Sequence, residues 1–222
     1  NLNFSEIVNQ VMIAKEELSD WGEQKKITNI VFMGMGEPFY NFENVKIAVD
    51  ILREKEGLNY GSRKITVSTA GISSKIPKAA REIGTYLALS LHAPTDEIRE
   101  MIMPINKKFK IKDLIDQCKY YTNIVKEKIT LEYVMLRGIN DTNDCAKNLV
   151  KLMAQFPSKV NLIEFNPWPG VQYLPTVRKE MEKFGKIIQD SGYVATIRRS
   201  RGQDILGACG QLKTESLKKI TK

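Results

Sequence analysis

The chain has 222 residues, of which 42% are hydrophobic and 27% charged, with 14 glycines and 8 prolines. These ordinary globular values exclude collagen-like, disordered and coiled-coil chains, and no apolar run reaches the roughly 18 residues that a membrane span needs. The 34 basic and 26 acidic side chains give a net charge of +8. This charge suits a polyanionic partner such as nucleic acid, although a lysine-rich surface without that role gives the same value.

The ends and the cysteines of the chain indicate its context. The first residue is Asn1, and a helical pattern starts at Phe4 without a preceding signal peptide, so we expect a piece of a longer protein. The three cysteines are odd in number and far apart. This pattern argues against a disulfide scaffold and favours a reducing, cytoplasmic compartment.

Helical and strand patterns alternate along the first half of the chain. Apolar residues recur at helical spacing near the start, and short β-rich runs each end in glycine or polar residues. The run 86–91 is almost continuously apolar, as expected for a strand covered on both faces. The predicted helices are 4–18, 41–52 and 74–83, and the predicted strands are 27–33, 64–69 and 86–91.

The second half continues this alternation after a loop-rich segment, 93–110, which contains one short helix. The tail from Lys213 is polar and rich in lysine. The predicted helices are 96–101, 111–125, a segment starting at 140–142 and leading into 145–156, and 176–190, and the predicted strands are 129–136, 160–165 and 193–197.

This alternation predicts parallel βα units with right-handed crossovers. Five clear strands follow one another, and a sixth lies near the end. No linker rich in Gly, Pro or Ser divides the chain, so we expect one domain. An open doubly wound sheet and a full or partial βα barrel both fit the pattern.

Unusual polar or glycine-rich groups follow four of the predicted strands. Each has a simple structural explanation, because glycines turn the chain, Ser68 can cap a helix, a lone histidine is usually structural and Asn-Pro initiates turns. Parallel strands nevertheless bring all four groups to one edge of the sheet, where sites form in α/β folds. The groups are Gly34–Pro38, Ser68–Gly71, Ser90–Pro94 and Asn166–Gly170.

The chemistry of these groups suits a polar, zwitterionic nucleotide. Glu37 places a carboxylate beside exposed glycine backbone, which suits an ammonium group. Ser68, Ser90 and Asn166 offer hydrogen bonds to ribose, carboxylate or adenine. The Gly34–Glu37 segment lacks the lysine of a phosphate loop and the spacing of a dinucleotide site.

The C-terminal region holds a second special group. Cys209 lies between Ala208 and Gly210, which leave its sulfur accessible, although an inert thiol in a flexible end has the same appearance. The other two cysteines, Cys118 and Cys145, lie on apolar helical stripes and are predicted to be buried. A solvated basic face or a set of phosphate contacts equally explains the arginines Arg198, Arg199 and Arg201.

Taken together, these motifs resemble the radical-SAM rRNA adenine methyltransferases of the RlmN/Cfr family. The resemblance runs in register over nearly the whole chain and is closer to the branch that methylates C2 than to the C8 branch. The motifs are Gly34–Met35–Gly36–Glu37–Pro38, Ser68–Thr69, Ser90–Leu91–His92–Ala93–Pro94, Pro104–Ile105–Asn106–Lys107, Glu132–Leu136, Asn166–Pro167 and Ala208–Cys209–Gly210–Gln211–Leu212.

The resemblance implies an α/β fold, a partial six-stranded parallel βα barrel. Its cofactors would be S-adenosylmethionine and a [4Fe–4S] cluster. Cys209 matches the cysteine that becomes an S-methylcysteine intermediate. The implied contacts of S-adenosylmethionine are Gly36, Glu37, Ser68, Ser90, Leu91, His92 and Asn166.

The chain departs from the family pattern because it has no Cys-x3-Cys-x2-Cys cluster loop, and cluster thiolates must lie close together. We therefore expect the first barrel strand and the cluster cysteines to be missing from this chain and to lie upstream of Asn1. Residues 1–212 would then form the radical-SAM core with its catalytic-cysteine segment, and residues 213–222 a basic tail.

The resemblance also implies a reaction and its partners. One S-adenosylmethionine methylates Cys209, and a second yields a 5′-deoxyadenosyl radical that activates the S-methyl group for addition to adenine C2. An upstream cysteine then releases the product by forming a disulfide with Cys209. The implied partners are 23S rRNA, tRNA and an electron donor such as flavodoxin, for a cytoplasmic monomer that contacts no membrane.

Three alternatives remain open from the sequence. The first is a methyltransferase of the C8 type. The second is an inactive remnant that binds RNA or cofactor. The third is an unrelated βα-barrel enzyme that uses Glu37 and His92 as general acid and base.

Overall fold

The computed structural model describes residues 1–22, 24–168 and 170–198. Its centre is a six-stranded sheet in which every neighbouring pair is parallel and the strand order equals the chain order. The prediction of five clear strands and a sixth near the end is confirmed. The strands are β1 (Ile30–Phe32), β2 (Ile65–Thr69), β3 (Tyr86–Ser90), β4 (Ile129–Met135), β5 (Ser158–Glu164) and β6 (Ala195–Arg198).

The helices agree closely with the sequence pattern, and local capping fixes several of their ends. Asn3 and Glu6 form a capping box at the start of the first helix, and Thr142 accepts a hydrogen bond from the Cys145 N–H at the start of the sixth. No helix in the described ranges is long and apolar enough to cross a membrane. The helices are α1 (Phe4–Glu17), α2 (Phe42–Arg53), α3 (Ile76–Glu82), α4 (Asp96–Ile102), α5 (Ile111–Val125), α6 (Asn143–Met153) and α7 (Arg178–Asp190).

The first strand is shorter than predicted, and a buried carboxylate explains why. Asp20 accepts hydrogen bonds from the Lys26 and Ile27 N–H groups, and the Tyr60 hydroxyl donates to the Ile27 carbonyl. These bonds occupy the backbone at the start of the predicted strand. Pairing with β2 therefore begins only at Ile30.

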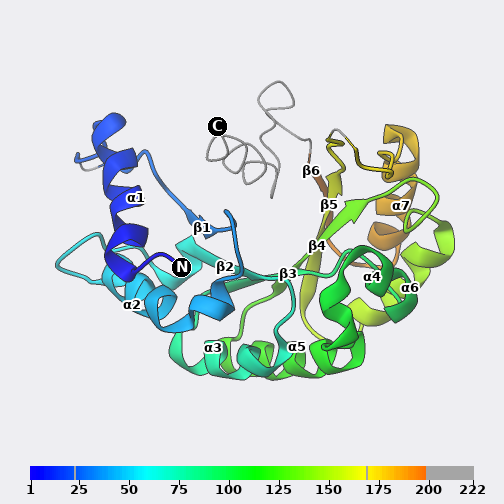
Figure 1. Cartoon of the computed structure of the whole chain (residues 1–222), viewed down its shortest axis with the longest axis horizontal. Helices are drawn as coiled ribbons and strands as arrows, with labels where there is room; N and C mark the ends of the chain where they lie inside the picture. The colour runs from blue at the N-terminus through cyan, green and yellow to red at the C-terminus, as the bar shows by residue number, and fades with distance from the viewer. Residues whose placement is uncertain (23, 169, 199–222) are drawn as a thin grey trace.

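The strand order distinguishes a barrel-type sheet from a doubly wound one. A doubly wound sheet reverses its order at a switch point, whereas here each strand lies beside the one before it in the chain. The sheet curves, and helices α2, α3, α5 and α6 cover its outer side (Figure 1). Among the described residues β1 and β6 are the two edges, so the α/β fold is an open, partial βα barrel, as predicted.

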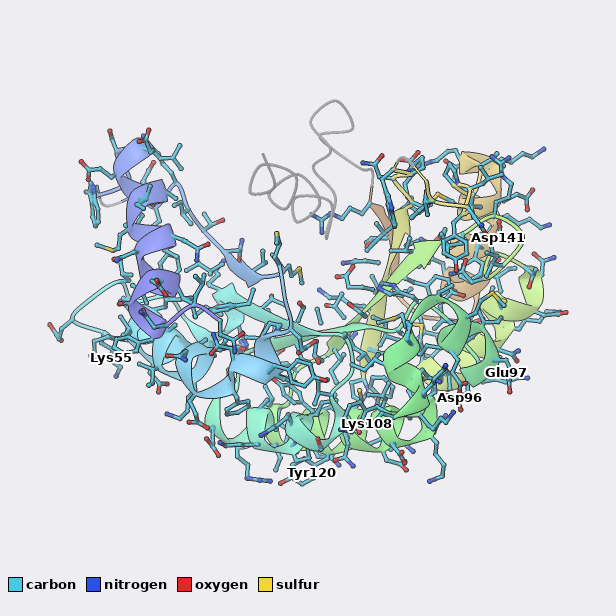
Figure 2. The ribbon with its side chains drawn as sticks, viewed as in Figure 1. Lys55, Asp96, Glu97, Lys108, Tyr120 and Asp141 are labelled. Atoms are coloured by element: carbon cyan, nitrogen blue, oxygen red, sulfur yellow. The ribbon has the colours of Figure 1, made fainter. Side chains whose placement is uncertain are left out.

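The two faces of the sheet have different chemistry. The residues of the outer face, such as Val67, Leu89 and Leu131, belong to the core and are buried beneath the helices. Tyr120 of α5 lies on the far, convex side of those helices (Figure 2). The alternate residues point to the inner face, which is mostly polar. Its members include Thr66, Ser68, Ser90, Thr130, Glu132, Lys159, Asn161 and Thr196.

Candidate functional site

The predicted site residues gather at the carboxyl edge of the sheet. Gly36 and Glu37 follow β1, Ser68 lies near the end of β2, and Ser90 ends β3. Asn166 follows β5. Since all six strands are parallel, these ends share one edge, as the sequence predicts.

Glu37 joins the loops after β1 and β2. Its Oε1 accepts a hydrogen bond of 3.0 Å from the Phe39 N–H, and its Oε2 accepts one of 2.6 Å from the Ala70 N–H. Each carboxylate oxygen retains a further lone pair. The carboxylate therefore fixes the loop geometry and can still accept a bond from an ammonium group.

The glycines beside Glu37 leave the backbone open. A Cβ atom added at Gly34 or Gly36 would meet nothing within 4 Å. Gly36 has a φ of +86°, a conformation that L side chains rarely adopt. Backbone groups in this segment are therefore accessible to a ligand without steric obstruction.

Ser68 connects β2 to β1. Its hydroxyl donates a 2.8 Å hydrogen bond to the Phe32 carbonyl, and its side chain is half-buried. The hydroxyl oxygen can still accept a bond from a ligand. Ser68 thus holds two strand ends together where the sequence predicts a cofactor contact.

His92 lies in a strained loop and is held as a neutral acceptor. Its φ is +57°, and its Nδ1 accepts a 3.1 Å hydrogen bond from the Val134 N–H. Burial, with a contribution from nearby Arg99, lowers the pKa of His92 to about 4. The neutral ring consequently carries its proton on Nε2. Since Glu37 and His92 both bind backbone groups, the geometry favours positioning roles over the acid–base pair of the third alternative.

Leu91 contributes backbone only, because its side chain is fully buried. Its N–H donates to the Glu132 carbonyl at 3.1 Å. A ligand at this position would meet the peptide group of Leu91 and not its side chain.

Sequence reasoning did not identify Arg99, whose side chain joins several backbone segments at this edge of the sheet. Its fully buried guanidinium ties the ends of β2 and β3 to the loop after α4. Burial lowers the pKa of Arg99 to about 10, so it remains charged near neutral pH. The signal in the sequence that could have pointed to Arg99 was the Pro104–Lys107 motif, because it contains Asn106, which accepts a hydrogen bond from Arg99. The acceptors are the carbonyls of Ala70, Ser90, Leu91 and Phe109 and the Oδ1 of Asn106.

Gly71 is required by this arrangement. An added Cβ would lie 2.9 Å from an Arg99 nitrogen, and φ at this position is +108°. The glycine after β2 therefore allows the guanidinium to reach the Ala70 carbonyl.

Sequence reasoning also did not identify Glu132 as a site residue, although the Glu132–Leu136 motif begins with it. In the sheet register it lies between Ser90 and Asn161. The Asn161 Nδ2 donates to its Oε1 at 3.0 Å, whereas its buried Oε2 has no hydrogen-bond partner in the described part of the chain. Burial raises the pKa of Glu132, and the Asn161 bond opposes this shift. A polar, partly unsatisfied layer therefore adjoins the predicted cofactor contacts.

The remaining predicted residues have varied placements. Asn166 is half-buried directly after β5, and Arg198 is exposed at the end of β6. Cys118 and Cys145 are buried, as predicted, and burial raises the pKa of the Cys118 thiol to about 12. Three predicted residues lie outside the described residues: Arg199, Arg201 and Cys209.

Two cavities, of about 410 and about 540 Å³, lie at the opposite, amino-terminal edge of the sheet. Both are lined by Tyr86 and Glu127. Neither includes a predicted site residue, so the cavities and the polar carboxyl edge are separate features.

The cofactors implied by the resemblance fit the described residues unequally. The open glycine backbone and the polar inner face suit S-adenosylmethionine, which carries an ammonium, a carboxylate, a ribose and an adenine. By contrast, no three Cys, His, Asp or Glu side chains in the described ranges form a group that could hold a metal ion. The described residues therefore supply no ligand set for an iron–sulfur cluster.

Comparison with known families shows which family the chain belongs to. The model of the Radical SAM superfamily matches residues 8–149. The chain belongs to the radical SAM superfamily.

Curated relatives in this superfamily extend the match over nearly the whole chain. The dual-specificity RNA methyltransferase RlmN of Hyphomonas neptunium is 49% identical in an alignment of 222 positions that covers 98% of this chain and 57% of that protein. RlmN of Parvibaculum lavamentivorans is 46% identical over 98% of this chain and 56% of its own length. The resemblance to radical-SAM methyltransferases is confirmed, and the chain spans just over half the length of these relatives.

Two solved structures share the architecture. A radical SAM methyltransferase from Sphaerobacter thermophilus has a TM-score of 0.89 and 42% identity, covering 95% of this chain and 62% of that one. SuiB of Streptococcus suis, at 13% identity and a TM-score of 0.63, covers 90% of this chain and 44% of its own and shows the fold alone. The predicted fold class is confirmed.

Proposed function

We propose that this chain is the core of an S-adenosylmethionine-dependent RNA methyltransferase that acts on C2 of an adenine in 23S rRNA and in tRNA. One observation carries the proposal. In a radical SAM chain of which 98% aligns with part of an RlmN protein, the four polar groups predicted from sequence meet at one edge of the sheet. Residues 1–212 would make up this core, and residues 213–222 a basic tail.

The carboxyl edge would hold S-adenosylmethionine, which supplies the methyl group when it is bound. The Gly36 backbone and the Glu37 carboxylate suit its ammonium, because one is sterically open and the other retains lone pairs. The polar groups of the other contacts suit its carboxylate, ribose and adenine. These contacts are Ser68, Ser90, the Leu91 backbone, His92 and Asn166.

We assign the methyl-carrier role to Cys209, where a thiolate would accept the methyl group as an S-methylcysteine. Support comes from the burial of Cys118 and Cys145, which keeps both from a ligand at the carboxyl edge. The described residues supply no ligands for an iron–sulfur cluster.

The partners follow from this reaction. Arg198, Arg199 and Arg201 would contact RNA phosphates, in keeping with the net charge of +8. A monomer in the cytoplasm, served by a flavodoxin-type electron donor, fits an enzyme that modifies both 23S rRNA and tRNA.

The deciding experiment supplies deuterated S-adenosylmethionine and RNA to the complete protein that contains this chain, followed by mass spectrometry of the nucleosides. Deuterated 2-methyladenosine is the expected product. Formation of 8-methyladenosine would support the C8 alternative. Binding of RNA and S-adenosylmethionine without any product would support a remnant that only binds.

The Cys209→Ala variant tests the carrier role in the same assay. We expect no methylated adenine from this variant and no methyl group on the corresponding peptide. An active Cys209→Ala variant would disprove the carrier role while leaving the class of enzyme intact.

A further inference from the structure

Three aromatic rings cluster directly after β5. The Phe165 ring is buried, and Trp168 and Tyr173 pack edge-on against it, with centroid separations of 5.5 and 6.4 Å. Edge-to-face packing is a favoured arrangement of aromatic pairs. Trp168 remains 43% exposed, so its indole is anchored on one side and open to solvent on the other.

The loop that carries these rings is fixed at its far end. Leu136 and Pro175 form an antiparallel bridge, and Arg137 donates its backbone N–H to the Leu174 carbonyl at 2.9 Å. The Arg137 Nε also donates to the Pro175 carbonyl at 3.0 Å. The exposed ring is thus held before any ligand arrives, which lowers the entropic cost of binding.

A second contact continues this attachment. The Thr176 hydroxyl donates to Asp141 Oδ2 at 2.8 Å, and Asp141 lies at the upper right end of the molecule in the side-chain view (Figure 2). The segment from Phe165 to Thr176 is therefore attached both to the end of β5 and to the connection between β4 and α6.

The position and charge of this loop favour an anionic, aromatic ligand. Asn166, a proposed cofactor contact, lies between Phe165 and Trp168 in the chain. Arg137 and Arg198 are exposed, and neither forms a salt bridge with another described residue. Arg198 pairs in register with Ile163 near the end of β5. Exposed aromatic rings with nearby arginines are the usual elements of single-stranded nucleic-acid sites.

We propose that Trp168 is a stacking platform for an unpaired RNA base beside the methylation site, with Arg137 and Arg198 contacting the adjoining phosphates. This proposal rests on the proposed function and names how the RNA is held. A protein partner would fit the aromatic ring alone, whereas RNA also accounts for the exposed charges of Arg137 and Arg198, which form no salt bridge with another described residue. Base stacking on a tryptophan is tolerant of sequence, which suits an enzyme with more than one RNA substrate.

The chain provides an internal optical test, because it has two tryptophans, Trp21 and Trp168. Trp21 is 53% exposed and lies between α1 and β1. In the Trp21→Phe variant all tryptophan emission comes from Trp168, and in the Trp168→Phe variant all of it comes from Trp21. Each variant is titrated with a short labelled single-stranded RNA, and the anisotropy of the label reports binding independently.

We expect RNA to quench the emission of Trp168 and to leave that of Trp21 unchanged. An abasic RNA of the same length should bind without quenching, because it has phosphates but no bases. Binding that leaves Trp168 emission unchanged, or equal quenching by the abasic strand, would show that Trp168 does not stack on a base. Neither result would contradict the proposed function. Failure of every variant to bind RNA would overturn the platform and the RNA partner together.

Affinity gives a second, matched comparison. Trp168→Ala should weaken RNA binding roughly 5- to 150-fold, the range that corresponds to the stacking of one base. Trp21→Ala removes an indole of similar exposure elsewhere and should leave binding unchanged. For Arg137→Gln, the slope of log affinity against log salt concentration should become smaller by about one, the value for one phosphate contact. Equal losses from both tryptophan variants would contradict a specific platform.

Discussion

Single residues in this protein hold the site by bonds that cross the sheet edge. Arg99 joins the ends of β2 and β3, and Glu37 joins the loops after β1 and β2. His92 adds a link to β4 through its imidazole. Each of these side chains satisfies backbone groups that irregular loops would otherwise leave unpaired. The precision of the site therefore depends on polar residues that need not touch a ligand.

The neutral state of His92 predicts a pH dependence of stability. The pKa of His92 is about 4 in the folded protein, against an ordinary value of 6.5. Unfolding therefore takes up a proton between these values, so the free energy of unfolding should fall as the pH drops from about 6.5 to about 4. Urea denaturation of the native chain at several pH values measures this slope.

The His92→Asn variant isolates the contribution of His92. Asparagine tolerates the left-handed backbone at this position, and its Oδ1 can replace Nδ1 as acceptor of the Val134 N–H. The variant should show a shallower loss of stability over the same pH range. If wild type and variant lose stability in parallel, His92 is not the titrating group.

At the scale of elements, the connection between β4 and α6 depends on one buried amide. The Asn140 Nδ2 donates to the carbonyls of His92 and Val134, each at 2.7 Å, and its Oδ1 accepts from the Leu136 N–H at 2.7 Å. The Tyr133 hydroxyl donates to the Asn140 carbonyl. A single side chain thus locks the end of β4 to the loop after β3.

Asn140→Asp tests this lock. The change replaces two donors by a carboxylate oxygen that faces two carbonyls, so we expect a loss of about 2–4 kcal/mol in the free energy of unfolding at neutral pH. Asn148→Asp, on the surface of α6, serves as the control and should change stability by less than about 0.5 kcal/mol. Denaturant midpoints for both variants measure the difference, and similar midpoints would refute the lock.

The elements could be predicted from sequence because their signals are local. Apolar spacing places α5 at Ile111–Val125, as predicted, and the polar groups after β1, β2, β3 and β5 identify the site edge. Glu132 could not be identified as a site neighbour, because its place beside Ser90 and Asn161 depends on the pairing register. Arg99 could not either, since its acceptors lie on separate loops and strand ends that only the fold brings together, and Ala70 is 29 residues away in the chain.

At the scale of the whole molecule, the thiols determine which metal chemistry this polypeptide can support. Cys118 and Cys145 are buried, and the chain has three cysteines in total. We therefore predict that the 222-residue chain, incubated anaerobically with iron and sulfide and then desalted, retains no [4Fe–4S] chromophore. Thiol counting before and after denaturation is the control, because the two buried thiols should react only after unfolding. A stable cluster on the monomer would contradict this expectation.

The agreement between strand order and chain order has a consequence for how the protein forms. Each βα unit pairs with the unit made immediately before it, so every strand pairing closes a single βα unit and none joins units that are remote in the chain. During synthesis every emerging strand meets an edge that already exists, and the growing sheet can serve as its own template. Among the described strands β6 is then the last to be added, so the edge of the sheet that bears Arg198 forms only after the other strand ends of the site are in place.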